Sequence, residues 1–169
     1  MPTPFTGPAG EHYVLYRLLQ REYVAGLAPE NAPNSDIIAT NVKGTKAAAI
    51  QVKTRRPLGS DDGWHMKDKH EELVGERMFY CFVDLKQEAT KSPDVYILPS
   101  RVVATVLKET NRIWLHQPGK NGQKHKETVM RRLLPDYSKT LRLSDAQKKR
   151  FGKGWIEKYK EDWSILGLD

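Results

Sequence analysis

The chain has 169 residues, one cysteine, and a formal net charge of +7 that comes from 28 Lys and Arg against 21 Asp and Glu. A single cysteine excludes an intrachain disulfide framework and a multi-cysteine zinc site. No apolar run approaches a membrane span, and the N-terminus has no secretory-signal pattern, so we expect a cytoplasmic protein with no membrane partner. The basic excess favours acidic partners such as nucleic acid, although many basic proteins bind none.

The N-terminal elements are an irregular arm, a helix and a loop. Proline and glycine are frequent in residues 1–10, which predicts an arm or a lead-in to a helix. Apolar residues then recur at helical spacing, so we expect a helix over about residues 11–25, with Gly26 as its stop. Two prolines within residues 27–34 favour a loop.

A β-hairpin is predicted next. Two short apolar runs, residues 35–40 and 47–54, flank a segment with the turn residues Asn and Gly. A polar stretch covers residues 54–70, and a short helix is expected near residues 69–75.

The middle of the chain alternates again between strands and a helix. Residues 79–85 and 95–98 are apolar runs of strand length. A Pro-Ser pair then opens a helix over residues 101–110, and residues 113–115 suggest a further short strand.

The last part of the chain is basic and then helical. Residues 117–132 carry many more basic than acidic side chains, and Ser144 is a reasonable cap for a C-terminal helix. The apolar stripe expected on that helix is Ile156, Tyr159, Trp163 and Leu166. The complete order of elements predicts an α/β or α+β fold with a small mixed sheet flanked by helices.

Glu11 is the first candidate functional residue. On an ideal helix it shares a face with the apolar residues Val14, Leu15 and Leu18. A carboxylate on that face is costly unless it is paired or binds a metal. The alternative is that Glu11 only favours the N-terminal end of the helix.

Asp36, Gln51 and Lys53 form the second candidate group. Asp36 starts the first strand of the hairpin, and strand alternation places Gln51 and Lys53 together on one face of the second strand. Asp36 is otherwise a turn residue, and Gln51 and Lys53 are otherwise the solvated face of an edge strand. The combination of these acids with Gln-x-Lys is typical of a metal-dependent phosphodiester site.

With these residues in place, the chain resembles the PD-(D/E)xK nuclease superfamily. Asn34-Ser35-Asp36 stands for the first half of the motif and Gln51-Val52-Lys53 for the second. The Gln-x-Lys variant is similar to the Mrr-like restriction endonucleases, and the helical acid is similar to that of Holliday-junction resolvases. The resemblance covers roughly the first hundred residues and implies a restriction-endonuclease-like core of a helix, three antiparallel strands, a helix and a further strand.

The length of 169 residues fits one domain with a C-terminal appendage. We expect residues 1–169 to form one nuclease-like domain, with the core at about residues 8–116. Residues 117–169 are then a basic loop and a C-terminal helical extension.

The activity that the resemblance implies is hydrolysis of DNA phosphodiester bonds by metal-activated water. Asp36 would bind Mg²⁺, or Mn²⁺ in its place, together with the Val52 carbonyl, Glu11 and the Gln51 amide oxygen. Lys53 would orient or deprotonate the attacking water, or stabilise charge on the phosphate.

Gln51 departs from the acid that is commoner at its position, because an amide ligates a cation without bringing negative charge. Two alternatives to a nuclease therefore remain. One is a catalytically inactive member of the fold that binds nucleic acid, and the other is a protein-interaction module. Double-strand cleavage in this family commonly requires a homodimer, a state that the sequence leaves open.

Basic side chains supply candidate contacts to the nucleic-acid backbone, because Arg and Lys neutralise phosphates without reading sequence. The candidates are Arg55, Arg56, Lys67, Lys69, Lys120, Lys124 and Lys126. The alternative for both basic segments is an ordinary solvated loop. His65 and His70 lack the partners of a zinc site.

Overall fold

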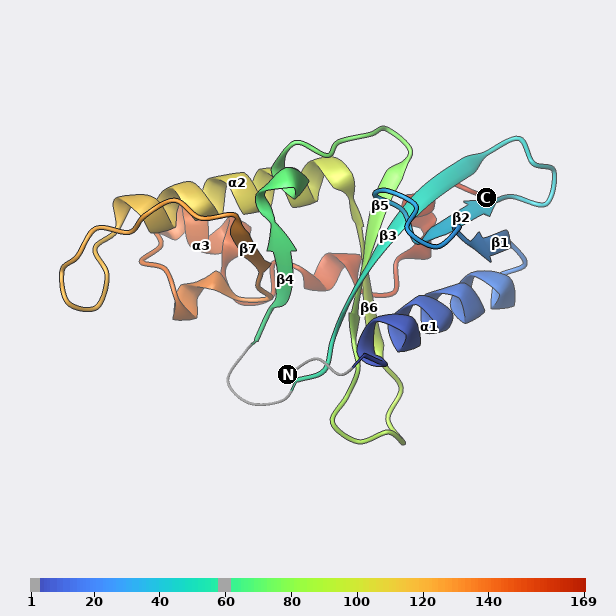
Figure 1. Cartoon of the computed structure of the whole chain (residues 1–169), viewed down its shortest axis with the longest axis horizontal. Helices are drawn as coiled ribbons and strands as arrows, with labels where there is room; N and C mark the ends of the chain where they lie inside the picture. Colours follow the sequence, from blue (N-terminus) through green and yellow to red (C-terminus); the bar gives the residue numbers. More distant parts are fainter. Residues whose placement is uncertain (1–3, 58–61) are drawn as a thin grey trace.

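The computed structural model describes residues 4–57 and 62–169, and it arranges them around two β-sheets (Figure 1). The larger sheet has the order β1-β2-β3-β5-β6, in which only β3 and β5 run parallel. Its strands are β1 (Val24–Leu27), β2 (Ile37–Thr40), β3 (Ala47–Arg55), β5 (Met78–Asp84) and β6 (Asp94–Pro99). The smaller sheet is an antiparallel ribbon of β4 (Trp64–Lys67) and β7 (Met130–Leu133). The mixed α+β class expected from the sequence is confirmed.

Helices cover both faces of the larger sheet. The α-helices are α1 (Thr6–Gln20), α2 (Ser100–His116) and α3 (Asp145–Phe151), and the short 3₁₀ turns are η1 (Asp68–Glu71), η2 (Tyr137–Lys139), η3 (Glu157–Tyr159) and η4 (Trp163–Leu166). Figure 1 shows α1, β1 and β2 towards one end of the long axis, and α2, α3 and the ribbon towards the other. Among the described residues, none of the helices combines the length and apolar character needed to cross a membrane.

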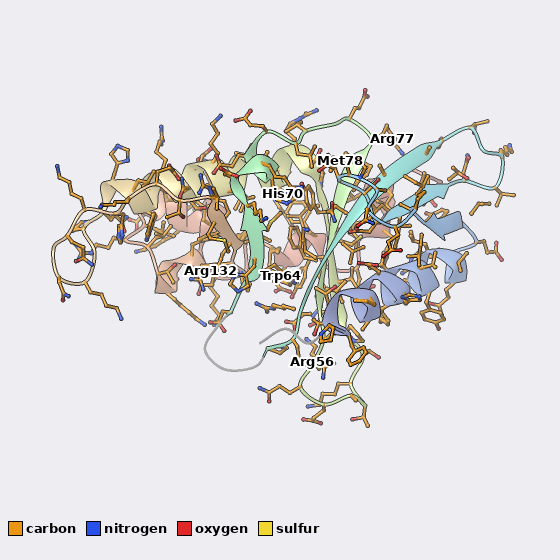
Figure 2. All side chains as sticks on the ribbon, viewed as in Figure 1. Arg56, Trp64, His70, Arg77, Met78 and Arg132 are labelled. Carbon is orange, nitrogen blue, oxygen red and sulfur yellow. The ribbon has the colours of Figure 1, made fainter. Side chains whose placement is uncertain are left out.

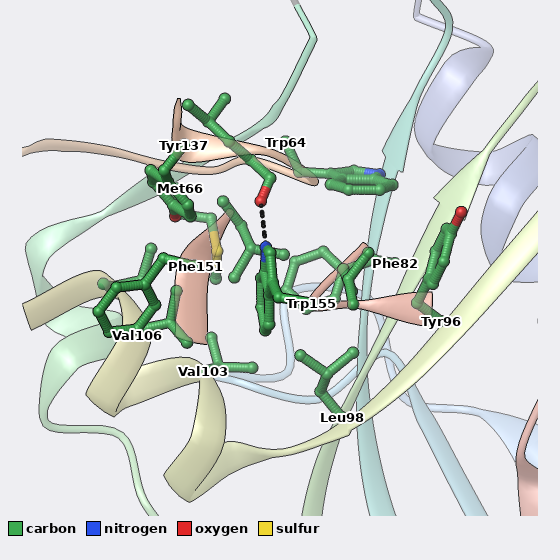
Figure 3. Close-up of a cluster of buried hydrophobic side chains, with 14 of the residues drawn as sticks. Trp64, Met66, Phe82, Tyr96, Leu98, Val103, Val106, Tyr137, Phe151 and Trp155 are labelled. Carbon is green, nitrogen blue, oxygen red and sulfur yellow. Dashed lines mark hydrogen bonds between the residues drawn. The ribbon is translucent and has the colours of Figure 1, made fainter. Parts of the chain in front are cut away.

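Strand β5 divides the core into two clusters because its side chains alternate between the two faces. Phe79, Cys81 and Val83 face the cluster that contains α1 and η4. Tyr80 and Phe82 face the other cluster, which is formed with α2, α3 and the ribbon (Figure 3). A strand buried on both faces explains why this segment is continuously apolar.

The first helix lies earlier in the chain than predicted. It begins at Thr6, inside the expected irregular arm, because Pro8 falls in the first turn, where a missing N–H costs no hydrogen bond. It ends at Gln20, and Glu22 has a left-handed φ of 63° that turns the chain back. The predicted helix to residue 25 is wrong, because Val24–Leu27 forms β1 as an edge strand beside β2.

The predicted hairpin is confirmed, with Ile37 opposite Ile50 and Thr40 opposite Ala47. The strands expected at residues 79–85 and 95–98 are confirmed as β5 and β6. The strand expected at residues 113–115 is wrong, because α2 continues to His116 and places Ile113 against the same core as Val106.

The ribbon was not expected from the sequence. Its two strands of four residues each pair across a long sequence separation, within regions predicted as polar or basic segments. Residues 58–61 of the first segment lie outside the described part of the chain. The short helix expected at residues 69–75 is only the 3₁₀ turn η1.

The C-terminal segment is helical for a shorter distance than predicted. The Ser144 cap is confirmed as a capping box, in which the Ser144 hydroxyl accepts a hydrogen bond from the Gln147 N–H. The expected single helix is wrong, because α3 ends at Phe151 and Gly154 adopts a φ of +85°. Ile156, Trp163 and Leu166 of the expected stripe are nevertheless buried, with Tyr159 half-buried.

Candidate active site

The second half of β3 forms the frame of the candidate site. Pairing between β2 and β3 stops at Ile37 and Ile50, so residues 51–55 of β3 pair only with β5, on the other side. Helix α1 approaches this stretch closely: a Cβ atom on Gly10 would lie 1.9 Å from the Thr54 Oγ1. Glycine permits that approach, and the next residue in α1 is Glu11.

Asp36 is fixed at the start of β2 by its neighbours on β3. Its backbone N–H donates to the Ile50 carbonyl at 2.8 Å. Its Oδ2 accepts hydrogen bonds from the Val52 N–H, at 2.7 Å, and from the Gln51 side-chain amide. Two donors on one carboxylate oxygen hold the side chain in a single orientation.

The Val52 carbonyl faces the same side of β3 as Asp36. In an extended strand, the N–H and the C=O of one residue point towards the same neighbour. Since the Val52 N–H points at Asp36, its carbonyl oxygen lies along the same open edge of β3.

Glu11, Asp36 and Lys53 are close enough to influence one another electrostatically. Burial raises the pKa of Glu11, the Asp36 charge raises it further, and Lys53 opposes that rise. Burial lowers the pKa of the Lys53 ammonium, against the attraction of Asp36 and Glu11. The structure therefore brings together an acid from α1, an acid before β2 and a base on β3.

His70 and Tyr80 lie next to these residues, and the sequence does not predict that they belong to the site. Tyr80 on β5 is paired in register with Gln51, and its hydroxyl lies 2.7 Å from the His70 Nδ1. Burial, together with the charges of Lys53 and Lys69, lowers the pKa of His70 to about 4, so the ring is neutral at neutral pH. No local pattern signals this pair, because it joins η1 to β5.

The donor atoms of the site fit a hard cation. Carboxylate and carbonyl oxygens are the ligands that Mg²⁺ and Mn²⁺ prefer, and Glu11, Asp36 and Val52 supply them. Burial and the Asp36 charge both raise the pKa of Glu11, and a bound cation would favour its ionised form. Within residues 4–57 and 62–169 no group of three or more His, Cys, Asp or Glu side chains is arranged so that it could hold a metal ion. Gln51 uses its N–H₂ group as a donor to Asp36.

The two arginines after Lys53 have different surroundings. Arg55 forms an ion pair with Asp84 at 2.7 Å, and its guanidinium lies 4.2 Å from the centroid of the Trp64 ring. The positive charge of Arg55 is therefore paired with Asp84 within the fold. Arg56 is exposed (Figure 2).

The predicted lysines separate into those near the site and those far from it. Lys69 donates from Nζ to the Asn34 Oδ1 at 3.3 Å, two residues before Asp36, and Lys67 is exposed at the end of β4. Figure 1 shows the loop between α2 and β7 at the end of the molecule away from α1. That loop carries the exposed side chains of Lys120, Lys124 and Lys126.

Comparison with known proteins agrees with a nuclease-like fold. No protein-family model matches the chain, and no curated protein matches it in sequence. Among solved structures, the chain is similar to a bacterial homing endonuclease, I-Ssp6803I, with a TM-score of 0.51 over 98% of this chain and 91% of that chain. The sequence identity is 15%, so the likeness shows the fold alone.

Proposed function

We propose that the protein is a metal-dependent endonuclease of the PD-(D/E)xK class that hydrolyses phosphodiester bonds in DNA. The observation that carries the proposal is the arrangement of Asp36, which Gln51 and Val52 hold in place, beside the electrostatically coupled Glu11 and Lys53. The likeness to a homing endonuclease supports DNA as the substrate.

In this function Asp36, Glu11 and the Val52 carbonyl would hold Mg²⁺ or Mn²⁺. When bound, the ion polarises the scissile phosphate and lowers the pKa of water. Lys53 lies on the same face of β3 as Gln51, where its ammonium orients the attacking water or offsets charge on the phosphate. Gln51 positions Asp36 through its amide.

Gln51 stands at a position where an acid is commoner, so the site carries less negative charge. Two carboxylates, rather than three, would surround a bound cation, so metal affinity would depend on Glu11 as well as Asp36. Because the pKa of Glu11 is raised, its ionised form is lost at a higher pH than for an ordinary glutamate. Metal binding and cleavage should therefore weaken on mild acidification.

A second candidate function is binding of nucleic acid without cleavage. The observation that favours it is the hydrogen bond from the neutral Gln51 amide to the Asp36 Oδ2. This bond holds the Asp36 carboxylate in place without a cation. Metal dependence separates the two functions, because a binder alone has no need of a divalent ion.

The test is nicking of supercoiled plasmid with Mg²⁺ or Mn²⁺. We compare the wild type with Asp36→Ala and Lys53→Ala, and use Lys43→Ala in the exposed β2–β3 turn as a control. Metal-dependent relaxation that both site variants lose, and the control keeps, would support the nuclease. Relaxation that survives both site substitutions would refute the proposed site. DNA binding that is salt-sensitive but never followed by cleavage would favour the second function.

A further inference from the structure

The β4–β7 ribbon has one buried face and one exposed face. Register pairs Trp64 with Leu133 and Met66 with Arg131, and these four side chains are buried. The alternate pairs are His65 with Arg132 and Lys67 with Met130, and all four of these side chains are exposed. The outer face is therefore polar and basic, with one thioether.

Buried contacts hold the ribbon firmly. The indole N–H of Trp64 donates to the Val83 carbonyl at 2.9 Å, and the Trp64 ring packs on Phe82 (Figure 3). At the other end, Arg131 pairs with Glu71 of η1 and with Glu127 at 3.0 Å. The Arg131–Glu71 pair joins β7 to η1. The carboxylates of Glu71 and Glu127 both contact the buried guanidinium of Arg131.

The ribbon is continuous with the candidate active site. Strand β4 runs directly into η1, where Lys69 contacts Asn34 beside the loop to Asp36. Figure 2 shows His70 next to the end of β4, and Arg132 on the other strand of the ribbon. The basic loop with Lys120, Lys124 and Lys126 leads into the first residue of β7. The ribbon and the segment that leads to Asp36 are therefore neighbours, and a polymer long enough to span both can contact them together.

The shape and charge of this face fit duplex DNA. The major groove of B-form DNA admits a two-stranded β-ribbon. Arg and Lys donate to the guanine O6 and N7, and an apolar side chain packs on the thymine methyl group. Lysines on a neighbouring loop suit phosphate contacts, which add affinity without adding sequence information.

We propose that the outer face of the β4–β7 ribbon enters the major groove of duplex DNA and reads base pairs there. Lys67 and Arg132 contact base edges, Met130 supplies an apolar contact, and the loop lysines bind the adjacent phosphates. The inference rests on the proposed function for its choice of DNA as partner. It goes beyond that function because it assigns sequence reading to the ribbon.

The experiment measures binding of the full chain to duplex DNA in EDTA, so that cleavage cannot interfere. A pool of random duplexes is selected for binding, and the bound sequences are compared for the wild type and Lys67→Ala/Arg132→Ala. The control, Lys43→Ala/Lys153→Ala, removes two exposed positive charges elsewhere. We expect the wild type and the control to select the same preferred bases. The ribbon variant should lose that preference and bind the preferred duplex about 10- to 100-fold more weakly.

A second measurement tests the groove without any substitution. Duplex DNA with glucosylated 5-hydroxymethylcytosine has a filled major groove, and netropsin fills the minor groove. We expect the wild type to bind the glucosylated duplex at least tenfold more weakly and to be indifferent to netropsin. The reverse result would overturn the major-groove assignment, even if the ribbon variant proved unstable.

The outcomes separate this inference from the proposed function. Equal preference and affinity in the ribbon variant and the control would overturn the inference and leave the nuclease intact. Failure of the wild type to bind any duplex would overturn the inference, and plasmid nicking in Mg²⁺ would then decide separately whether the nuclease stands. The ribbon variant can lose the base preference while the wild type shows no plasmid nicking. That result would support DNA reading by the ribbon and refute the nuclease.

Discussion

The active-site region and the ribbon use charge in opposite ways. The active-site region holds Glu11 and Lys53 partly buried. Burial raises the pKa of Glu11 and lowers the pKa of Lys53, and both shifts favour the neutral form. The ribbon leaves Lys67 and Arg132 exposed and buries only Arg131, with two acidic partners. Buried charges that lower stability are characteristic of functional sites, whereas exposed charges are characteristic of surfaces that bind a charged partner.

Lys53→Met should give the largest effect, in opposite directions on activity and stability. Removal of the ammonium should lower the nicking rate by about 10²- to 10³-fold, as when a preorganised electrostatic group is lost. The same change should raise the free energy of unfolding at pH 7 by about 1 kcal/mol, because a buried charge is removed. Nicking rates and denaturant unfolding measure the two effects.

The pH dependence gives the sign of the Lys53 contribution. Its folded pKa lies below the unfolded value of 10.5, so its stabilising contribution is present above pH 10.5 and is lost as the pH falls through the lowered pKa. The stability advantage of Lys53→Met should therefore shrink as the pH rises through the alkaline range. A variant that is less stable than the wild type at pH 7 would show that Lys53 is structural.

Arg55→Ala should mainly affect stability, because Arg55 joins the two regions. The variant loses the contact with Trp64 and leaves the Asp84 carboxylate, with a side-chain exposure of 11%, without its cation. We expect a loss of about 2–4 kcal/mol in the free energy of unfolding. Arg55→Met/Asp84→Leu, which removes both charges, should recover most of that loss. Weaker DNA binding in Arg55→Met/Asp84→Leu, at restored stability, would assign Arg55 to the nucleic-acid surface instead.

His70 should make the protein sensitive to acid. Its folded pKa, about 4, lies below the unfolded value of 6.5, so its contribution is present above pH 6.5 and is lost as the pH falls towards 4. Over that interval we expect the wild type to lose about 1–3 kcal/mol more than His70→Asn, which cannot titrate. Urea unfolding at several pH values measures the difference. Parallel curves for the two proteins would show that His70 is not buried in the neutral form.

Gln51→Glu tests the departure from the commoner acid. The added carboxylate loses the hydrogen bond to Asp36 and repels it, so the variant should be less stable than the wild type in EDTA. It should reach half-maximal nicking at a Mg²⁺ concentration about tenfold lower, because a third carboxylate attracts the ion. Gln51→Met removes the same hydrogen bond without the charge. An equal Mg²⁺ requirement in the wild type and Gln51→Glu would place the cation away from residue 51.

The same contrast governs what the sequence could predict. Asp36, Gln51 and Lys53 lie on one predicted hairpin, in which strand alternation places Gln51 and Lys53 on one face, and helical periodicity singles out Glu11. The ribbon depends on pairing between Trp64–Lys67 and Met130–Leu133, strands too short to carry a pattern and far apart in the chain. The His70–Tyr80 contact and the Arg55–Asp84 ion pair could not be predicted either, because each joins residues that are far apart in the chain. Edge strand β1 was missed because Val24–Leu27 continues the apolar pattern of the preceding helix.

A parallel assay of Asp36→Ala and Lys67→Ala/Arg132→Ala separates catalysis at the active site from DNA binding by the ribbon. Each protein is measured for plasmid nicking in Mg²⁺ and for duplex binding in EDTA. We expect Asp36→Ala to lose nicking by at least about 10³-fold and to bind DNA as the wild type does. The ribbon variant should bind more weakly and recover nicking at high protein concentration. Nicking by Asp36→Ala at the rate of the wild type would show that this carboxylate does not belong to the catalytic site.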